Sequence, residues 1–159
     1  MHDPPALDGF DRRLLAALQR DASRSNQALA DLVGLSASQV SRRRARLEEA
    51  GVIRRYRAEI DGRRLGLGVL AFVQVRLSTH NPDNARRFRE LVRTVPEIQE
   101  SHALTGDMDY LVKVAVADLA ALAGLVNDVL LPHESVAHVR SSIALETLKD
   151  TNELPIPLR

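Results

Sequence analysis

Apolar and polar residues alternate with different periods in the two halves of the chain. In the first sixty residues the apolar positions recur every three or four residues, as they do in helices packed on a shared core. A first helix is predicted from Phe10, Leu14, Leu15 and Leu18, with Asp8 or Asp11 as its cap. From residue 69 onward, short β-rich runs are separated by two helical stretches. The pattern therefore predicts a helical domain followed by an α+β domain.

The segment from Asn26 to Gly51 has the pattern of two short helices joined by a turn. Ala30 is small enough for close packing, Gly34 suits the turn, and Gly51 suits the end of the second helix. Ser36 followed by Gln39 forms a capping box. The apolar positions fall where a helix-turn-helix buries its contacts: Leu29, Val33, Leu35, Val40 and Leu47. We therefore predict a helix-turn-helix, with residues 1–60 as one domain.

The second predicted helix is strongly basic on its outer face. Ser38, Arg42 and Arg46 point away from Val40 and Leu47 on a helical wheel. Between residues 36 and 57 there are seven arginines against two glutamates, an excess of +5. An alternating run at 52–60 predicts a strand in the position of a wing, whose arginines can contact phosphates. The predicted DNA contacts are Ser36, Ser38, Gln39, Arg42, Arg43, Arg46, Arg54 and Arg55, with Gln39 and Arg42 nearest the bases.

The second half of the chain has the element order β-α-β-β-α-β. Glycine-rich residues 61–68 form the predicted linker, residues 69–148 the second domain, and residues 149–159 a C-terminal arm. The element order is that of a ferredoxin-like domain. Its predicted strands are 69–77, 97–105, 110–116 and 136–148, and its predicted helices start at Asn81 and Asp118 and end at Pro96 and before Pro132.

Charge is distributed unevenly although the whole chain carries only +1. Residues 1–60 hold 11 Lys+Arg against 8 Asp+Glu, and residues 61–159 hold 11 against 13. The basic excess thus lies in the half with the helix-turn-helix, as expected of a protein that binds nucleic acid. The absence of cysteine excludes disulfides and thiolate metal sites. With neither a signal-peptide core nor a membrane-length apolar run, we expect a cytoplasmic protein.

These parts together resemble the Lrp/AsnC (feast/famine) family of transcriptional regulators. The resemblance covers nearly the whole chain and is carried by LDGFDRRLLAALQRDASRSNQALADLVGLS, RLEEAGVI, LGLGVLAFVQV and above all ESHALTGDMDYLVKV. It implies a winged helix-turn-helix domain followed by a ferredoxin-like βαββαβ domain of the RAM type. It also implies double-stranded DNA as partner, assembly into a homo-oligomer (a dimer, assembling further to a tetramer or octamer), and in many members an amino-acid effector held between neighbouring subunits.

Two positions depart from the family pattern. Arg44 stands where an apolar residue usually lies, so either its stem follows the helix-turn-helix core or the helix is slightly rotated. On the last strand Val139 and Ser141 replace a usual pair of threonines. An amino acid needs an anion beside its ammonium and amides beside its carboxylate. The predicted effector residues are Leu104, Thr105, Gly106, Asp107, Asp109, Val139 and Ser141.

Two other functions fit parts of the sequence. Asp107 and Asp109 resemble paired catalytic carboxylates, but aspartates of this spacing more often form turns, and no nucleophile or phosphate-loop motif accompanies them. We therefore predict no enzyme, no cofactor and no metal. The remaining alternative to an amino-acid-responsive regulator is a nucleoid-type architectural protein that binds DNA without a small-molecule effector. An effect of an amino acid on DNA affinity or assembly separates the two.

Overall fold

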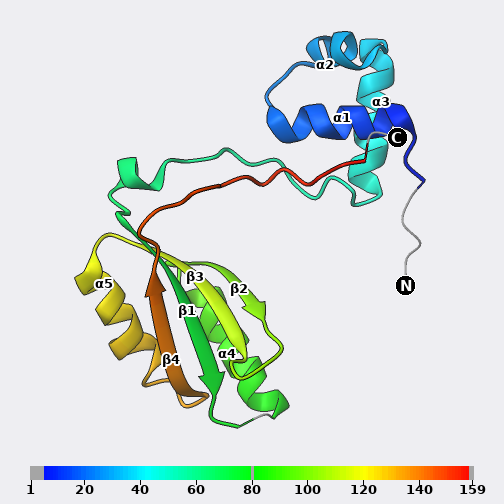
Figure 1. Cartoon of the computed structure of the whole chain (residues 1–159). Coiled ribbons are helices and arrows are strands. Elements are labelled where there is room, and N and C mark those ends of the chain that lie inside the picture. Colours follow the sequence, from blue (N-terminus) through cyan, green and yellow to red (C-terminus); the bar gives the residue numbers. More distant parts are fainter. Residues whose placement is uncertain (1–5, 80, 158–159) are drawn as a thin grey trace. The chain divides into compact units, whose positions relative to one another are not determined.

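The computed structural model describes residues 6–79 and 81–157, which form two compact units (Figure 1). The first unit contains the chain up to Glu59 together with the chain from Lys149 onward, and the second runs from Ile60 to Leu148.

Three helices form the first unit: α1 (Gly9–Arg20), α2 (Asn26–Val33) and α3 (Ala37–Glu49). Each helix starts at a polar cap; at α1 the cap Asp8 and residue Asp11 bond each other's backbone N–H. Gly34 ends α2 with φ +74°, a conformation that favours glycine, and so permits the tight turn into α3. The buried core consists of Leu14, Leu15, Leu18, Leu29, Ala30, Val33, Val40 and Leu47. The predicted helix-turn-helix is confirmed.

The strand predicted at residues 52–60 is not formed. Val52 and Ile53 turn back onto α3, where both donate their backbone N–H to the carbonyl of Leu47, at 2.9 and 3.1 Å. Beyond them the chain is extended, but it has no strand partner among the described residues. Alternation alone predicted the wing strand wrongly, because a strand also requires a neighbour to accept its ladder hydrogen bonds.

The C-terminal segment returns to α1 and completes the first unit. The Gln19 side chain donates to the carbonyl of Leu154 (3.2 Å) and accepts from its N–H (2.7 Å). Arg12 Nη1 donates to the carbonyl of Pro157 at 2.9 Å. Ile156 packs against the helix-turn-helix core. The segment predicted as an arm is therefore a packed part of the helical unit.

The second unit contains one four-stranded antiparallel sheet in the order β2-β3-β1-β4. A short 3-10 helix, η1, precedes the sheet, and the π-helical turns of η2 continue α5 directly. The elements are η1 (Gly62–Leu65), β1 (Val69–Leu77), α4 (Pro82–Thr94), β2 (Ile98–Ala103), β3 (Tyr110–Val116), α5 (Leu119–Gly124), η2 (Leu125–Leu130) and β4 (Val136–Ile143). The predicted βαββαβ order is confirmed; β4 ends at Ile143 rather than Leu148, where its pairing with β1 stops.

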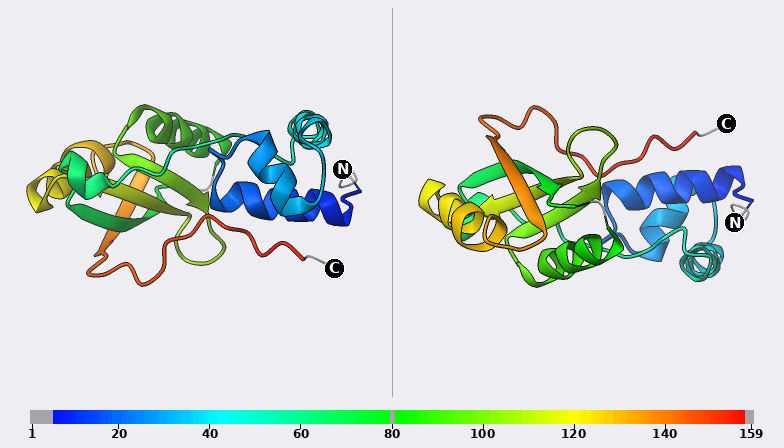
Figure 2. Two further views of the ribbon diagram at one scale, coloured as in Figure 1. Left: turned by 90° about the horizontal axis from the view of Figure 1, so that it is seen from above. Right: turned by 90° about the horizontal axis from the view of Figure 1, so that it is seen from below.

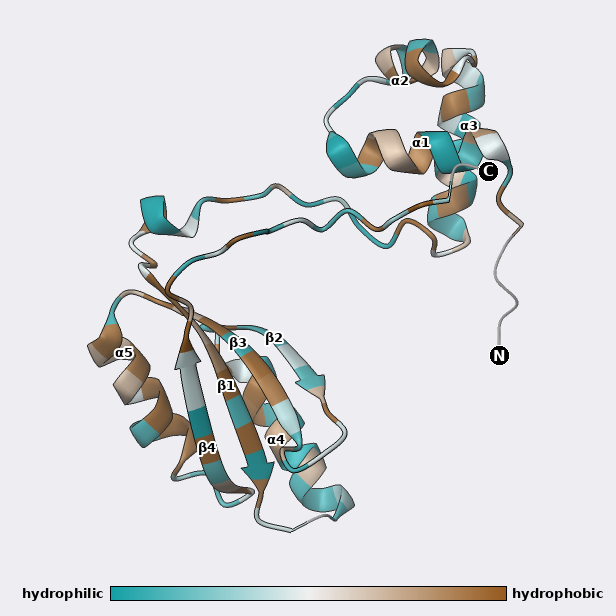
Figure 3. Cartoon of the chain, viewed as in Figure 1, coloured by the Kyte–Doolittle hydropathy of each residue, from teal (hydrophilic) through white to brown (hydrophobic). Residues whose placement is uncertain are grey.

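One face of the sheet carries the core and both helices (Figure 2). Alternate residues of β1, from Ala71 to Leu77, are buried there against Phe88 of α4 and Leu122 of α5. The apolar character of β3 and α5 is visible in Figure 3. The opposite face has no described helix of this unit over it, and Phe72 on that face is 37% exposed.

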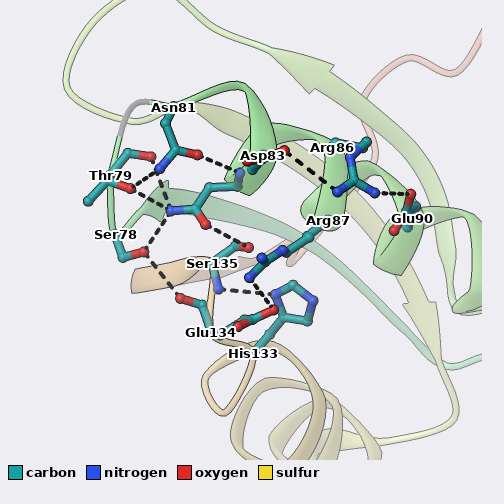
Figure 4. Close-up of polar contacts among 11 residues, drawn as sticks. Ser78, Thr79, Asn81, Asp83, Arg86, Arg87, Glu90, His133, Glu134 and Ser135 are labelled. Carbon is teal, nitrogen blue, oxygen red and sulfur yellow. Dashed lines mark hydrogen bonds and ion pairs between the residues drawn. The ribbon is translucent and has the colours of Figure 1, made fainter.

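A polar network joins the end of β1, the start of α4 and the turn before β4 (Figure 4). Asn84 donates to the hydroxyls of Ser78 (3.1 Å) and Thr79 (2.6 Å). The fully buried Ser135 donates its hydroxyl to Asn84 Oδ1 at 3.4 Å. No predicted site residue belongs to this network. Its hydrogen bonds satisfy buried polar atoms and hold α4 against the sheet.

Candidate functional site

The outer face of α3 is small and polar, with Arg42 exposed near its centre. Val40 and Leu47 are fully buried against the other helices, so Ser38, Arg42 and Ala45 face away from the core. Serine and alanine leave room for a close approach of a nucleic-acid groove, and Arg42 can donate two hydrogen bonds to guanine. Ala45 was not among the predicted contacts, because an alanine offers no hydrogen-bonding group by which a sequence pattern could single it out.

The start of α3 is held by the predicted capping box. Gln39 Oε1 accepts from the backbone N–H of Ser36 at 2.9 Å, and the Ser36 and Ser38 hydroxyls are 3.0 Å apart. The amide oxygen of Gln39 is therefore engaged in the cap, whereas its NH₂ group is a donor that can face a ligand. All three side chains are exposed at one end of the outer face.

Arg43 and Arg46 point toward α1 instead. Arg43 Nη1 lies 2.7 Å from Asp11 Oδ1 and 2.8 Å from Asp8 Oδ2, and Arg46 Nη2 bonds Asp11 Oδ2. The bond to Asp11, followed by that to Asp8, raises the pKa of the Arg43 guanidinium above its ordinary value. The Asp11 side chain is fully buried. A local sequence pattern could not predict these ion pairs, because their partners lie on two different helices, α1 and α3.

Arg44 is half-buried on the opposite flank of α3. Its Nη1 donates to Asn26 Oδ1 of α2 at 2.9 Å, and its guanidinium lies over the Tyr56 ring, 5.2 Å from the centroid. The Tyr56 hydroxyl in turn donates to Glu48 Oε1 at 2.7 Å. The guanidinium of Arg44 is thus hydrogen-bonded to Asn26 and Tyr56 at the edge of the helix-turn-helix. Tyr56 thereby holds the extended segment after α3.

The remaining predicted DNA contacts lie in that extended segment. Arg54 and Arg55, and their neighbour Arg57, are exposed. Tyr56 fixes the middle of the segment to α3, so these arginines emerge beside the recognition helix. Their long, charged side chains suit phosphates, which can be contacted from many directions.

The β2–β3 loop holds five of the predicted effector residues. Gly106 has φ +115°, and Leu104 N–H donates to the Asp109 carbonyl at 2.8 Å across the loop. The Asp109 carboxylate accepts the N–H of Leu77 at 2.7 Å, so it also fixes the end of β1. Thr105 and Asp107 are exposed. Asp109 is therefore part of the loop's framework, whereas Asp107 faces solvent.

The other two predicted effector residues lie on the opposite edge of the sheet. Val139 pairs with Val75 and Ser141 pairs with Val73, which places both on β4 beside β1. Two strands, β1 and β3, separate β4 from β2. With strands about 4.8 Å apart, β4 lies roughly 10 Å from β3 and roughly 14 Å from β2, the two strands that the loop joins. Val139 also packs on the core. One copy of the chain does not bring the predicted effector residues together.

Residues 6–79 and 81–157 contain no cluster of three His, Asp or Glu side chains that could hold a metal ion. No helix in the same range has the length and apolar character needed to cross a membrane.

The first unit has the architecture and exposed recognition helix of a helix-turn-helix DNA-binding protein. Comparison with known families agrees: residues 7–48 match the AsnC-type helix-turn-helix domain, and residues 70–154 match the Lrp/AsnC ligand binding domain. The chain belongs to the Lrp/AsnC family of transcriptional regulators, and it is accordingly a DNA-binding regulator and not an enzyme.

Relatives match the chain along nearly its whole length. The leucine-responsive regulatory proteins of Klebsiella pneumoniae and Escherichia coli K12 are each 37% identical over 153 residues, covering 96% of this chain and 93% of theirs. A transcriptional regulator of Neisseria meningitidis, solved as a complex with L-Met, is 36% identical with a TM-score of 0.91, covering 94% and 97%. An AsnC family regulator from Agrobacterium tumefaciens is 37% identical with a TM-score of 0.88, covering 94% and 97%.

Proposed function

We propose that this regulator contacts the bases of duplex DNA with the outer face of α3 and changes its DNA binding when an amino acid binds the second unit. The observation that carries the proposal is the exposed row of Ser38, Arg42 and Ala45 opposite a buried Val40 and Leu47. Such a face fits the major groove, where an α-helix can reach base edges. Arg42 supplies the two donors that select guanine O6 and N7, whereas Gln39, whose Oε1 is held in the cap, offers its NH₂ group to N7 of a purine.

The DNA part is tested by comparing two arginines with different proposed partners. Arg42→Ala should weaken binding to a selected operator by about 1–3 kcal/mol more than binding to random duplex, because it removes a base contact. Arg55→Ala should weaken both alike and flatten the salt dependence by about one unit of slope, because it removes a phosphate contact. The operator is obtained by selection from a randomised duplex library with the wild-type protein. Identical behaviour of the two variants on both duplexes would contradict the assignment.

The effector part rests on the β2–β3 loop. Asp107 is an exposed carboxylate next to Gly106, where backbone amides are accessible and no Cβ blocks approach. These groups complement the ammonium and carboxylate of a free amino acid. The relative from Neisseria meningitidis was solved with L-Met, which supports this ligand class. Since Val139 and Ser141 lie across the sheet, a site containing all the predicted residues requires a second copy of the chain.

The uncovered face of the sheet is the proposed surface for that second copy. Leu70, Phe72 and Leu111 occupy it without a helix of the unit over them in the described structure. Burial of such a face by a partner is favourable through the hydrophobic effect. We expect a dimer, with further assembly to a tetramer or octamer. Light scattering at micromolar concentration tests this, and a monomer would contradict it; Phe72→Glu should shift the distribution to smaller species, whereas Arg76→Glu at the exposed end of the same face should shift it less.

A thermal-shift screen against the standard amino acids tests the effector. A ligand that stabilises the protein should also change its affinity for the selected operator, with a coupling of about 1–3 kcal/mol. Asp107→Ala should remove the response while leaving ligand-free DNA binding intact. Asp109→Ala should remove it too, but that variant also loses the bond to Leu77. If no amino acid alters stability, assembly or DNA binding, the architectural, effector-free function is favoured instead.

A further inference from the structure

Asp11 of α1 is a fully buried carboxylate with partners on the recognition helix. Its two oxygens accept from Arg43 at 2.7 Å and from Arg46, and Oδ2 also accepts the backbone N–H of Asp8 at 3.2 Å. A buried carboxylate is retained only when it is paired and hydrogen-bonded. Asp11 thus fixes where two arginines of α3 point.

The charges around Asp11 sum to zero. Arg43 is held by both Asp8 and Asp11, and its side chain is only 21% exposed. Arg46 is 54% exposed, but its guanidinium is bonded to Asp11. The two positive charges therefore face two negative ones, although a count along residues 36–57 assigns both arginines to the basic excess. A matched arginine displaces fewer counterions from DNA than an unmatched one.

We propose that Asp11 is a positioning residue for DNA recognition, which withholds Arg43 and Arg46 from phosphates and leaves Arg42 as the arginine that α3 presents to the groove. The inference rests on the proposed contact face of α3. Non-specific affinity comes almost wholly from phosphate contacts, whereas base contacts provide discrimination. Holding two arginines away from the backbone consequently lowers binding to random DNA and increases the ratio of specific to non-specific affinity.

A role confined to stability predicts something different. Arg43 and Arg46 would then help to hold α1 and α3 together and still contact phosphates in the complex. Removing either would flatten the dependence of affinity on salt. The salt slope on random DNA therefore separates the two roles, because it counts the phosphates neutralised and not the stability of the fold.

The first experiment compares Arg42→Gln with Arg43→Gln, neighbours on one helix that lose the same charge. Binding is measured on a random-sequence duplex and on the operator selected by the wild type. The salt concentration runs from about 0.05 to 0.3 M KCl, a range that includes physiological ionic strength. Circular dichroism verifies that the variants are compared at equal folded fraction. On random DNA, which lacks the operator's bases, Arg42 faces the charged backbone instead, so Arg42→Gln should flatten the slope there by about one unit. Arg43→Gln should leave both that slope and the ratio of operator to random affinity near the wild-type values, because Arg43 does not reach phosphate. Equal flattening by both variants would overturn the proposal.

The second experiment removes the charge of Asp11 with Asp11→Asn, which releases Arg46 and leaves Arg43 paired with Asp8. For each arginine that reaches a phosphate, the slope of log affinity against log salt on the random duplex should become steeper by roughly one unit. Each such contact adds about tenfold to the gain in affinity when the salt concentration falls tenfold. The ratio of operator to random affinity should fall. Asp31→Asn, an exposed aspartate of α2, is the control for one lost negative charge in the same unit. A folded Asp11→Asn protein that behaves as the control does would refute the proposal.

The two experiments remain decisive together. If Asp11→Asn does not fold, the comparison of Arg42→Gln with Arg43→Gln decides alone. If Arg42→Gln matches the wild type on both duplexes, the proposed contact face of α3 fails, and that outcome is recognisable whatever Asp11→Asn does.

Discussion

Ile156 should stabilise the helical unit from a position close to the end of the chain. It packs against the core formed by α1, α2 and α3, and the hydrogen bonds between Gln19 and Leu154 hold the segment in place. Replacing Ile156 with alanine removes three carbon atoms from that contact. The backbone bonds of the segment are unaffected by the substitution, so the change isolates the packing of one side chain.

The size of the effect follows from partial burial. Three fully buried carbons contribute about 2.4 kcal/mol at roughly 0.8 kcal/mol each. Because Ile156 is only partly buried, we expect a loss of about 1.5 kcal/mol in the free energy of unfolding of the helical unit. For a unit of this size that corresponds to a fall of about 6–12 °C in Tm.

Differential scanning calorimetry measures the shift, and hydrogen exchange of the α1 amides assigns it to the helical unit. Leu154→Ala is the matched control, because Leu154 is 72% exposed and its contribution to the Gln19 bonds comes from the backbone. We expect that control to change the free energy of unfolding by less than about 0.5 kcal/mol. Equal Tm values for the two variants, or faster exchange confined to the sheet, would refute the packing of the C-terminal segment on α1.

Three further predictions concern local features. Asp109→Ala should destabilise the second unit by about 1–3 kcal/mol because Leu77 N–H loses its acceptor, whereas Asp107→Ala should leave the calorimetric Tm nearly unchanged. The pKa of Asp8 is lowered by the Asp11 backbone N–H and then by Arg43, so the ionised Asp8 stabilises the fold above about pH 3.9 and this stabilisation is lost as pH falls through the lower, folded-state pKa. Between about pH 5 and 2, Tm should therefore fall less steeply for Asp8→Asn, which keeps the cap but does not titrate. Gly106→Ala should lower the free energy of unfolding, measured by chemical denaturation, by about 1–3 kcal/mol, because alanine is strained at a φ of +115°. Gly124→Ala, at a helical φ of −57°, should not lower it.

Elements specified by neighbouring residues were predictable from the sequence. The capping box of Ser36 and Gln39, the glycine turn at Gly34 and the β-rich run Val69–Leu77 each involve residues a few positions apart, and the structure forms all three. The βαββαβ order follows in the same way, since each run carries its own period and stop signals. Membership of the Lrp/AsnC family was likewise evident in the sequence and is established by the family matches.

Tertiary structure decided the features that depend on distant partners. Asp11 meets Arg43 across 32 positions and Gln19 meets Leu154 across 135, and no local pattern specifies either pairing. The wing strand failed for the same reason, because strand formation requires a neighbouring strand that alternation cannot supply. The sheet order also separated Ser141 from the β2–β3 loop. Local sequence patterns determined most of the elements and what they carry, whereas long-range packing determined which charges stay exposed and which are matched within the protein.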